Sequence, residues 1–182
     1  MVEEQMVNGV DTRALKEMAQ ALKENPELAE CRFKVTNEWD NCGHNKTTIS
    51  GFHAKGEDIQ HQAPFTLEAD EPPLLLGSDK GPNPVEHLLN ALVSCLTTSM
   101  VYHAAVQGIE IQELESTVEG DLNLRGFMGI SSEVPKGYQN IRVSFRAKSD
   151  GDPEKLKACA LYSPVFNTIT QGANIEVDVE TT

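Results

Sequence analysis

The N-terminal hydrophobic positions recur at helical spacing. In DTRALKEMAQALKE, residues 11–24, apolar side chains return every three or four positions, and Asp11 or Thr12 can cap the first turn. The pair Asn25–Pro26 then breaks the pattern, because a proline disfavours helix in the residue before it. The pattern predicts an exposed amphipathic helix, which we assign to an N-terminal appendage spanning residues 1–30.

Apolar and polar positions alternate through most of the remaining chain, which is typical of half-buried strands. Predicted strands cover residues 31–39, 46–54, 64–70, 109–124, 138–148 and 174–180. The linker DNCGHN predicts a hairpin between the first two strands, since Asn, Asp and Gly favour tight turns. The acidic run EADE, residues 68–71, is expected to be solvated surface at the end of a strand.

One long apolar segment, residues 84–107, interrupts the strands and predicts a helix. Asn83 can cap it, with Pro84 at the first helical position and Glu86 at the third, close to a capping box. Its apolar residues lie nearly all round, so we expect it to be buried. Shorter helices are predicted over residues 152–161 and 164–171. This order predicts an α+β fold with antiparallel sheets, within one domain over residues 31–182.

The charge of the chain restricts its partners. The formal net charge is −13, which argues against binding to nucleic acid or to an anionic membrane. No apolar run reaches the expected length of a membrane span, and the N-terminus lacks the layout of a signal peptide. We therefore expect a cytoplasmic protein. The histidines and glycines form no metal-binding or phosphate-binding pattern, so no metal and no cofactor are assigned.

The stretch NALVSCLTTSM places Cys95 in the middle of the long helix. Free cysteine often fills a core position, and the composition alone favours that interpretation. A reactive thiolate requires a cation or hydrogen-bond donor close by, and no cationic residue lies within one helical turn. A cationic partner of Cys95 would therefore have to come from another segment.

Several stretches together carry a resemblance to a known family. The segments FTLEADEPPLLLGSDKGPNPVEHLLNALVSCLTT, VYHAAVQGIEI, GYQNIRVSF and SPVFNTITQGANIEV are similar to the OsmC/Ohr family, the osmotically inducible protein C and organic hydroperoxide resistance proteins. The resemblance runs from about Arg32 to the C-terminus. It rests on the NPxE-type helix start, the cysteine further along that helix, and the later Ser-Pro-Val segment.

The resemblance implies an α+β fold in which two chains intertwine as a homodimer, with the active sites at the subunit interface. It also implies reduction of organic hydroperoxides by two cysteines. A peroxidatic thiolate becomes a sulfenic acid, and a resolving cysteine converts it to a disulfide that external thiols reduce. In this sequence Cys95 matches the peroxidatic position.

The other family positions are altered. Ser163 stands where the family has its resolving cysteine, and serine also caps a helix before Pro164. Val85 stands at the position of the family's glutamate, and Glu86 is one place displaced. Glu86 and Cys95 are nine positions apart, and at about 100° per residue this separation puts Glu86 nearly opposite Cys95 on a regular helix.

The family's arginine is missing as well. The first hairpin contains no arginine, so Lys46 or His44 would have to replace it. Lysine supplies a charge without the bidentate fork of arginine. Cys159 and Cys42 are alternative resolving thiols, in that order, although inert free thiols are the simpler interpretation of both. A cycle with one cysteine and a small external thiol is also chemically consistent.

Three hypotheses follow from the sequence. The first is a thiol-dependent hydroperoxide reductase that acts in oxidative stress defence through Cys95, with Glu86, Lys46 and Ser163 at the site. The second is a non-enzymatic homodimer that binds a small apolar or acidic ligand, in which Cys95 is structural. The third is a transferase or hydrolase in which His44 activates Cys95.

Overall fold

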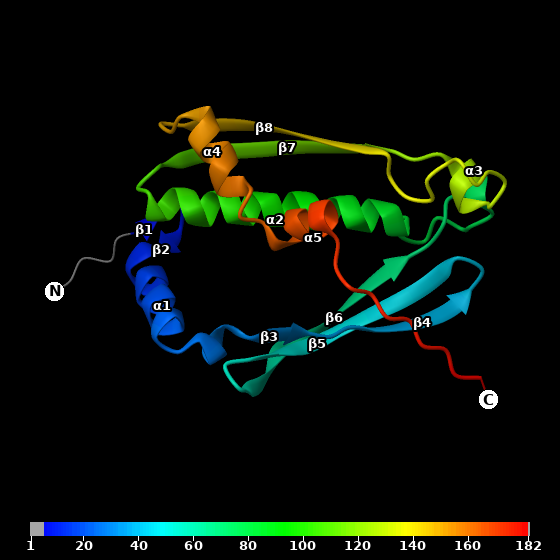
Figure 1. Cartoon of the computed structure of the whole chain (residues 1–182), viewed down its shortest axis with the longest axis horizontal. Coiled ribbons are helices and arrows are strands. Elements are labelled where there is room, and N and C mark those ends of the chain that lie inside the picture. The colour runs from blue at the N-terminus through cyan, green and yellow to red at the C-terminus, as the bar shows by residue number, and fades with distance from the viewer. Residues whose placement is uncertain (1–5, 182) are drawn as a thin grey trace. The chain divides into compact units, whose positions relative to one another are not determined.

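The computed structural model describes residues 6–181, and within this range the chain divides into two compact units. The first contains residues 11–88 and the second contains residues 6–10 and 89–181. The helix α2, Pro84–Val106, begins in the first unit and continues in the second. Figure 1 labels the elements of both units.

The first unit contains a four-stranded antiparallel sheet, preceded by α1, Thr12–Glu24, and a short 3-10 helix, Pro26–Ala29. The strands are β3, Cys31–Phe33; β4, Thr36–Asn41; β5, His44–Ala54; and β6, Glu57–Ala69. β5 pairs with β6 along one edge and with β3 and then β4 along the other. The helix expected over residues 11–24 and the hairpin after Asn41 are thus confirmed. The expected boundary after residue 30 stays a prediction.

The two faces of this sheet differ in chemistry. Side chains on one face form a series of ring contacts, from Phe33 to Phe52 at 5.4 Å, to His61 at 5.8 Å and to Phe65 at 5.0 Å between centroids. The opposite face carries His53 and the two charged residues that pair with it, Arg32 on β3 and Asp58 on β6. The ring face remains open in the single chain, because Phe33 is 75% exposed.

The start of α2 follows the predicted local chemistry. The Asn83 side chain accepts a hydrogen bond from the Val85 N–H at 2.9 Å, and the Glu86 carboxylate accepts one from the Asn83 N–H at 2.8 Å. These reciprocal bonds form the capping box that the sequence predicts. The helix ends before Gly108, whose φ of 73° is the left-handed conformation that glycine adopts without strain.

The second unit is built on α2 and a long antiparallel hairpin, and Figure 1 shows the hairpin running beside the helix. Its other elements are β1, Met6–Val7; β2, Val10–Asp11; β7, Ile111–Asp121; α3, Leu124–Phe127; β8, Asn140–Ser149; α4, Pro153–Ala160; and α5, Pro164–Gln171. The core joins one stripe of α2 to α4. Its buried members are Leu92, Leu96, Met100, Ala104, Leu156, Cys159 and Ala160.

Two expectations about α2 are corrected. It is not buried all round, because Leu88, Tyr102 and Val106 are exposed and only one stripe enters the core. It is also long and apolar enough to cross a membrane by length and composition alone, contrary to the expectation that no segment would be. Its buried stripe packs against α4 in the second unit, as the core helix of a globular unit does.

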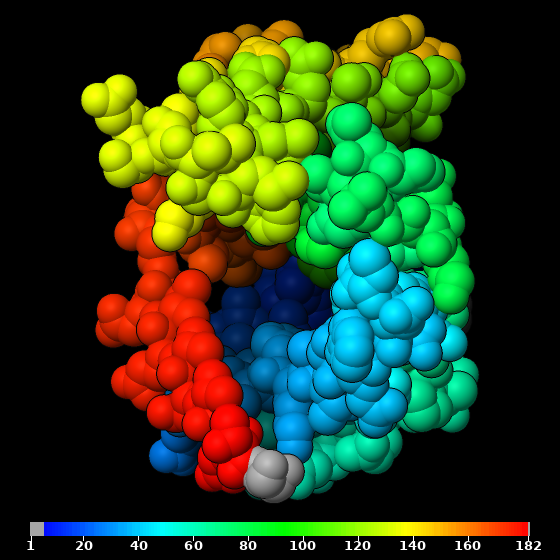
Figure 2. Space-filling view, turned by 90° about the vertical axis from the view of Figure 1, so that its right-hand side faces the viewer, coloured from blue at the N-terminus to red at the C-terminus, as the bar shows by residue number. Residues whose placement is uncertain are grey.

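The strand predicted over residues 174–180 is absent. This segment has no regular secondary structure, and Ile175, Val177 and Val179 are each at least 80% exposed. Figure 2 shows the C-terminal segment, in red, at the surface. An alternating sequence becomes a strand only when a neighbouring backbone pairs with it, and none of the described residues does so here.

Candidate functional site

Cys95 lies on α2 beside the buried stripe and is itself half-buried. Cys95 is not one of the buried core residues, although Leu92, three positions before it, and Leu96, directly after it, both are. Among residues 6–181, the Cys95 sulfur has no hydrogen-bond partner and no ion pair. Cys95 is therefore neither a full member of the core nor held in a polar network within the single chain.

Ser163 has a structural role in the second unit. Its side chain is 0% exposed, and its hydroxyl oxygen accepts a hydrogen bond from the Phe166 N–H at 3.1 Å. Ser163 is therefore the N-cap of α5, directly before Pro164. No hydrogen bond in the described part of the chain joins Ser163 to Cys95. A serine in this position cannot form a disulfide with a sulfenic acid.

The two alternative resolving thiols, Cys159 and Cys42, have different surroundings. Cys159 is 1% exposed and belongs to the core, where its sulfur accepts a hydrogen bond from the Gln107 amide at 3.1 Å. Burial raises the pKa of the Cys159 thiol, and the bond from Gln107 offsets this only in part. Because exchange requires a thiolate, these surroundings disfavour Cys159 as a resolving residue. Cys42 is exposed, in the turn between β4 and β5.

His44 is the centre of a charged cluster in the first unit. It is 4% exposed, and its two ring nitrogens contact Asp40 at 2.7 Å and Glu68 at 3.0 Å. The hydrogen bonds to Asp40 and then to Glu68 raise the pKa of His44, and the pKa values of both carboxyls are lowered mainly by the same bonds. With both nitrogens occupied, His44 has no nitrogen left to activate a thiol. This disfavours the hypothesis of a His44–Cys95 pair.

Lys46 lies at the edge of the same cluster. Its ammonium is 3.6 Å from the second oxygen of Glu68, and the side chain is about half exposed. The nearby Lys80 ammonium is 3.9 Å from Asp40. Lys46 therefore neutralises a carboxylate of its own sheet, while Glu86 caps α2. Lys46 and Glu86 belong to the first unit, and Cys95 and Ser163 belong to the second.

The acidic run that was expected to be solvated contains a buried residue. Asp70 is 1% exposed and accepts hydrogen bonds from the N–H groups of Glu71 at 2.8 Å, Ser78 at 3.1 Å and Lys80 at 3.2 Å. Burial alone would raise the pKa of Asp70, but these three donors outweigh it and hold its pKa below the usual range. Asp70 thus fixes the loop that leads into α2.

Glu71 lies at the start of α2, where the Asn83 side-chain amide donates a hydrogen bond to its carboxylate. Burial, and then the charges of Asp70 and Glu86, raise the pKa of Glu71. The sequence did not single out this residue, although a carboxylate directly before a Pro-rich loop and a helix cap was the available signal. In the described part of the chain, no group of His, Cys, Asp and Glu side chains is arranged to hold a metal ion.

The family model described as OsmC-like protein matches residues 77–178, which is more than half of the chain and includes the helix start, Cys95 and Ser163. This chain belongs to the OsmC-like protein family. A search of curated proteins finds no match.

Solved structures agree with the OsmC-like fold. An OsmC-like protein from Mycoplasma pneumoniae is 19% identical, with a TM-score of 0.55 over 76% of this chain and 87% of the other. An osmotic stress and detoxification response protein from Psychrobacter arcticus is 16% identical, with a TM-score of 0.56 over 76% and 88% of the two chains. An OsmC-like protein of unknown function from Vibrio cholerae is 13% identical, with a TM-score of 0.54 over 75% and 92%. At these identities the likeness establishes the α+β fold with antiparallel sheets and a long helix.

Proposed function

We propose that this OsmC-like protein reduces organic hydroperoxides with Cys95 as its single reacting cysteine, in defence against oxidative stress. The observation that carries the proposal is the position of Cys95 on α2: it matches the family's peroxidatic cysteine, yet lies outside the sealed core. A structural cysteine would be expected inside that core, as Cys159 is.

The proposed cycle uses two external thiols. The Cys95 thiolate attacks the terminal oxygen of the hydroperoxide, the O–O bond breaks, and the alkoxide takes a proton to leave as an alcohol. The resulting sulfenic acid reacts with one external thiol to give a mixed disulfide and water. A second thiol then attacks the mixed disulfide, releasing an external disulfide and restoring the Cys95 thiolate.

The absence of an internal resolving step follows from the surroundings of the other candidates. Ser163 carries no thiol, and burial disfavours the thiolate of Cys159. Glu86 and Lys46 are proposed as the remaining polar groups of the site, but each already has a partner in its own unit. We therefore assign them supporting roles and place the chemistry on Cys95.

The protein is proposed to act as a cytoplasmic homodimer. Support for a second copy comes from the apolar side chains that the single chain leaves exposed. They lie on the ring face of the first sheet and on the C-terminal segment, and include Phe33, Val35, Trp39, Phe65, Ile175, Val177 and Val179. A sedimentation experiment that finds only monomer at micromolar concentration would contradict this part of the proposal.

The direct test is consumption of cumene hydroperoxide by the purified full chain, with dithiothreitol or dihydrolipoate as reductant. We expect turnover in the wild type, none in Cys95→Ala, and unchanged turnover in Cys159→Ala and Cys42→Ala. Absence of turnover with both reductants would contradict the enzymatic proposal. Loss of turnover in Cys42→Ala would instead assign the resolving role to the hairpin thiol.

A second candidate function, binding of a small apolar or acidic ligand, is supported by a cavity in the second unit. Its volume is about 860 Å³, and the apolar side chains of α2, β8, α4 and α5 line most of it. Arg146 and Lys157 also line it, each paired with a carboxylate: Arg146 with Glu115 at 3.4 Å and Lys157 with Glu154 at 3.7 Å. A cavity of this size, with a mostly apolar lining, suits a small apolar ligand. Native mass spectrometry of the protein as purified tests this: a bound mass that Leu96→Trp removes would support it.

A further inference from the structure

The first sheet is interrupted at one point on both sides of β5. On one side of β5, Phe52 pairs with β3 and Thr48 pairs with β4, and the residues between Phe52 and Thr48 have no partner. On the other side, Gly51 and Ile49 both pair with β6, and the residue between them has no partner. Ser50 therefore has no Cα partner in either neighbouring strand. A β-bulge of this kind bends the strand and is often found where a sheet carries a site.

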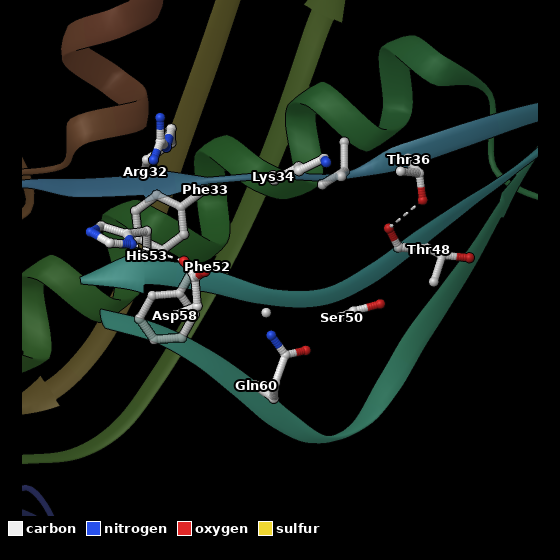
Figure 3. Close-up of a pocket in the computed structure, with 12 residues that line it drawn as sticks. Arg32, Phe33, Lys34, Thr36, Thr48, Ser50, Phe52, His53, Asp58 and Gln60 are labelled. Carbon is white, nitrogen blue, oxygen red and sulfur yellow. Dashed lines mark hydrogen bonds and ion pairs between the residues drawn. The ribbon is translucent and has the colours of Figure 1, made fainter. Parts of the chain in front are cut away.

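A hollow of about 610 Å³ lies at this interruption. Figure 3 shows β6 bowing away from β5 there, with the Gln60 amide pointing into the gap. Gly51 is required for this arrangement, because a Cβ on it would overlap the carbonyl oxygen of Ile59. The polar groups that line the hollow include Arg32, Lys34, Thr36, Thr48, Ser50 and Gln60.

The hollow has uncompensated positive charge. Neither Arg32 nor Lys34 forms an ion pair with any residue in the range 6–181, although the chain as a whole carries a net charge of −13. The acidic residue at the hollow, Asp58, is 2.8 Å from the His53 ring nitrogen, so its carboxylate contacts His53 and forms no ion pair with Arg32 or Lys34. Two free cations in an otherwise acidic protein favour an anionic ligand.

The uncharged polar side chains at the hollow indicate which class of anionic ligand it suits. The Ser50 hydroxyl and the Gln60 amide have no hydrogen-bond partner in the described part of the chain, and both lie at the hollow. The rings of Phe33 and Phe52 stack with each other, and the strand alternation directs them to the opposite face from Arg32 and His53. Charged and hydrogen-bonding residues make up most of the lining, beside Phe33, Val35 and Phe52. An anionic ligand with several polar groups would therefore use more of these side chains than an apolar ligand.

We propose that this hollow binds a small phosphorylated polyol, with the phosphate at Arg32 and Lys34 and the hydroxyl groups at Ser50 and Gln60. Two cations match the double charge of a phosphate monoester better than the single charge of a carboxylate. A volume of about 610 Å³ lies within the range of sites for small metabolites. The site is within the first unit and does not depend on the chemistry of Cys95.

The test is calorimetric titration of the full chain with ribose 5-phosphate at low ionic strength, beside ribose and inorganic phosphate. We expect saturable binding of ribose 5-phosphate, no detectable binding of ribose, and weaker binding of inorganic phosphate. The double variant Arg32→Gln/Lys34→Gln should weaken ribose 5-phosphate binding by about tenfold or more, because it removes two charge-assisted contacts.

A matched control removes the same charge elsewhere in the first unit. Lys16→Gln/Lys23→Gln changes two exposed lysines of α1 and should leave the affinity within about twofold. Ser50→Ala should weaken ribose 5-phosphate but not inorganic phosphate, since it removes a contact to the polyol. The proposal is overturned by no saturable binding at millimolar ribose 5-phosphate, by equal binding of inorganic phosphate, or by equal losses in the two double variants.

Discussion

Replacing Ser163 with alanine tests the assignment of this residue as a structural cap. The change removes the hydroxyl oxygen that accepts a hydrogen bond from the Phe166 N–H at 3.1 Å. Ser163 is 0% exposed, so water cannot reach the freed N–H group. Loss of an N-cap costs about 0.5–2 kcal/mol, and the upper end applies where water cannot replace the lost partner. We therefore expect a loss of about 2 kcal/mol in the free energy of unfolding of Ser163→Ala.

The assay is urea unfolding followed by circular dichroism, with Asp152→Ala as the matched control. Asp152 caps α4 in the same unit but is exposed, so water can satisfy the freed N–H groups. Its loss should cost about 1 kcal/mol or less. If Ser163→Ala is no less stable than Asp152→Ala, the buried cap is not the role of Ser163.

The variant Ser163→Cys extends the same experiment to chemistry. Sulfur is a weaker hydrogen-bond acceptor than oxygen, so its stability should lie between those of the wild type and Ser163→Ala. The new thiol stands at the family's resolving position, and we expect peroxide treatment to yield a disulfide with Cys95. Non-reducing peptide mapping detects that disulfide. Its absence, with Cys95 oxidised, would show that the two positions do not meet.

Three further predictions concern other parts of the chain. Cys31 and Cys42 should react with a thiol reagent in the native state faster than Cys159, which should react only after denaturation, because Cys159 is buried and its pKa is raised. The thermal midpoint of the wild type should fall as the pH rises through the raised pKa of His44 in the folded protein. The stabilisation from this raised pKa is fully present below the pKa of His44 in the unfolded chain and is lost above its pKa in the folded protein. The variant His44→Gln should lack this alkaline fall. Leu96→Ala should lower the free energy of unfolding by about 2–3 kcal/mol. This is the low end for a core leucine, because Leu96 also lines a cavity. A loss below about 1 kcal/mol in urea unfolding would contradict its core position.

The features that the sequence predicts correctly are local in the chain. The capping box of Asn83 and Glu86 and the cap at Ser163 depend on residues within three positions of each other. The β4–β5 hairpin follows from its turn residues, and β7 and β8 follow from alternation over a few residues. The strand predicted over residues 64–70 is only the second half of β6, which begins at Glu57. The fold class follows from the order of the elements. Such features need no knowledge of the distant packing.

The features that the sequence misses depend on distant partners. Glu68 reaches His44 across the sheet, 24 positions away, and the buried Asp70 is held by N–H groups up to 10 positions away. The interruption at Ser50 depends on the register of three strands at once. The segment 174–180 has a strand pattern but no partner among the described residues, so the pattern alone overestimates the regular structure.

The central claim, that Cys95 is the single reacting thiol, is tested most directly by trapping its sulfenic acid. The full chain is treated with one equivalent of cumene hydroperoxide in the presence of dimedone, and the adduct is located by peptide mass spectrometry. The account predicts one adduct at Cys95, with none at Cys159 and no disulfide between protein cysteines. An adduct confined to Cys31 or Cys42, with Cys95 unmodified, would contradict it.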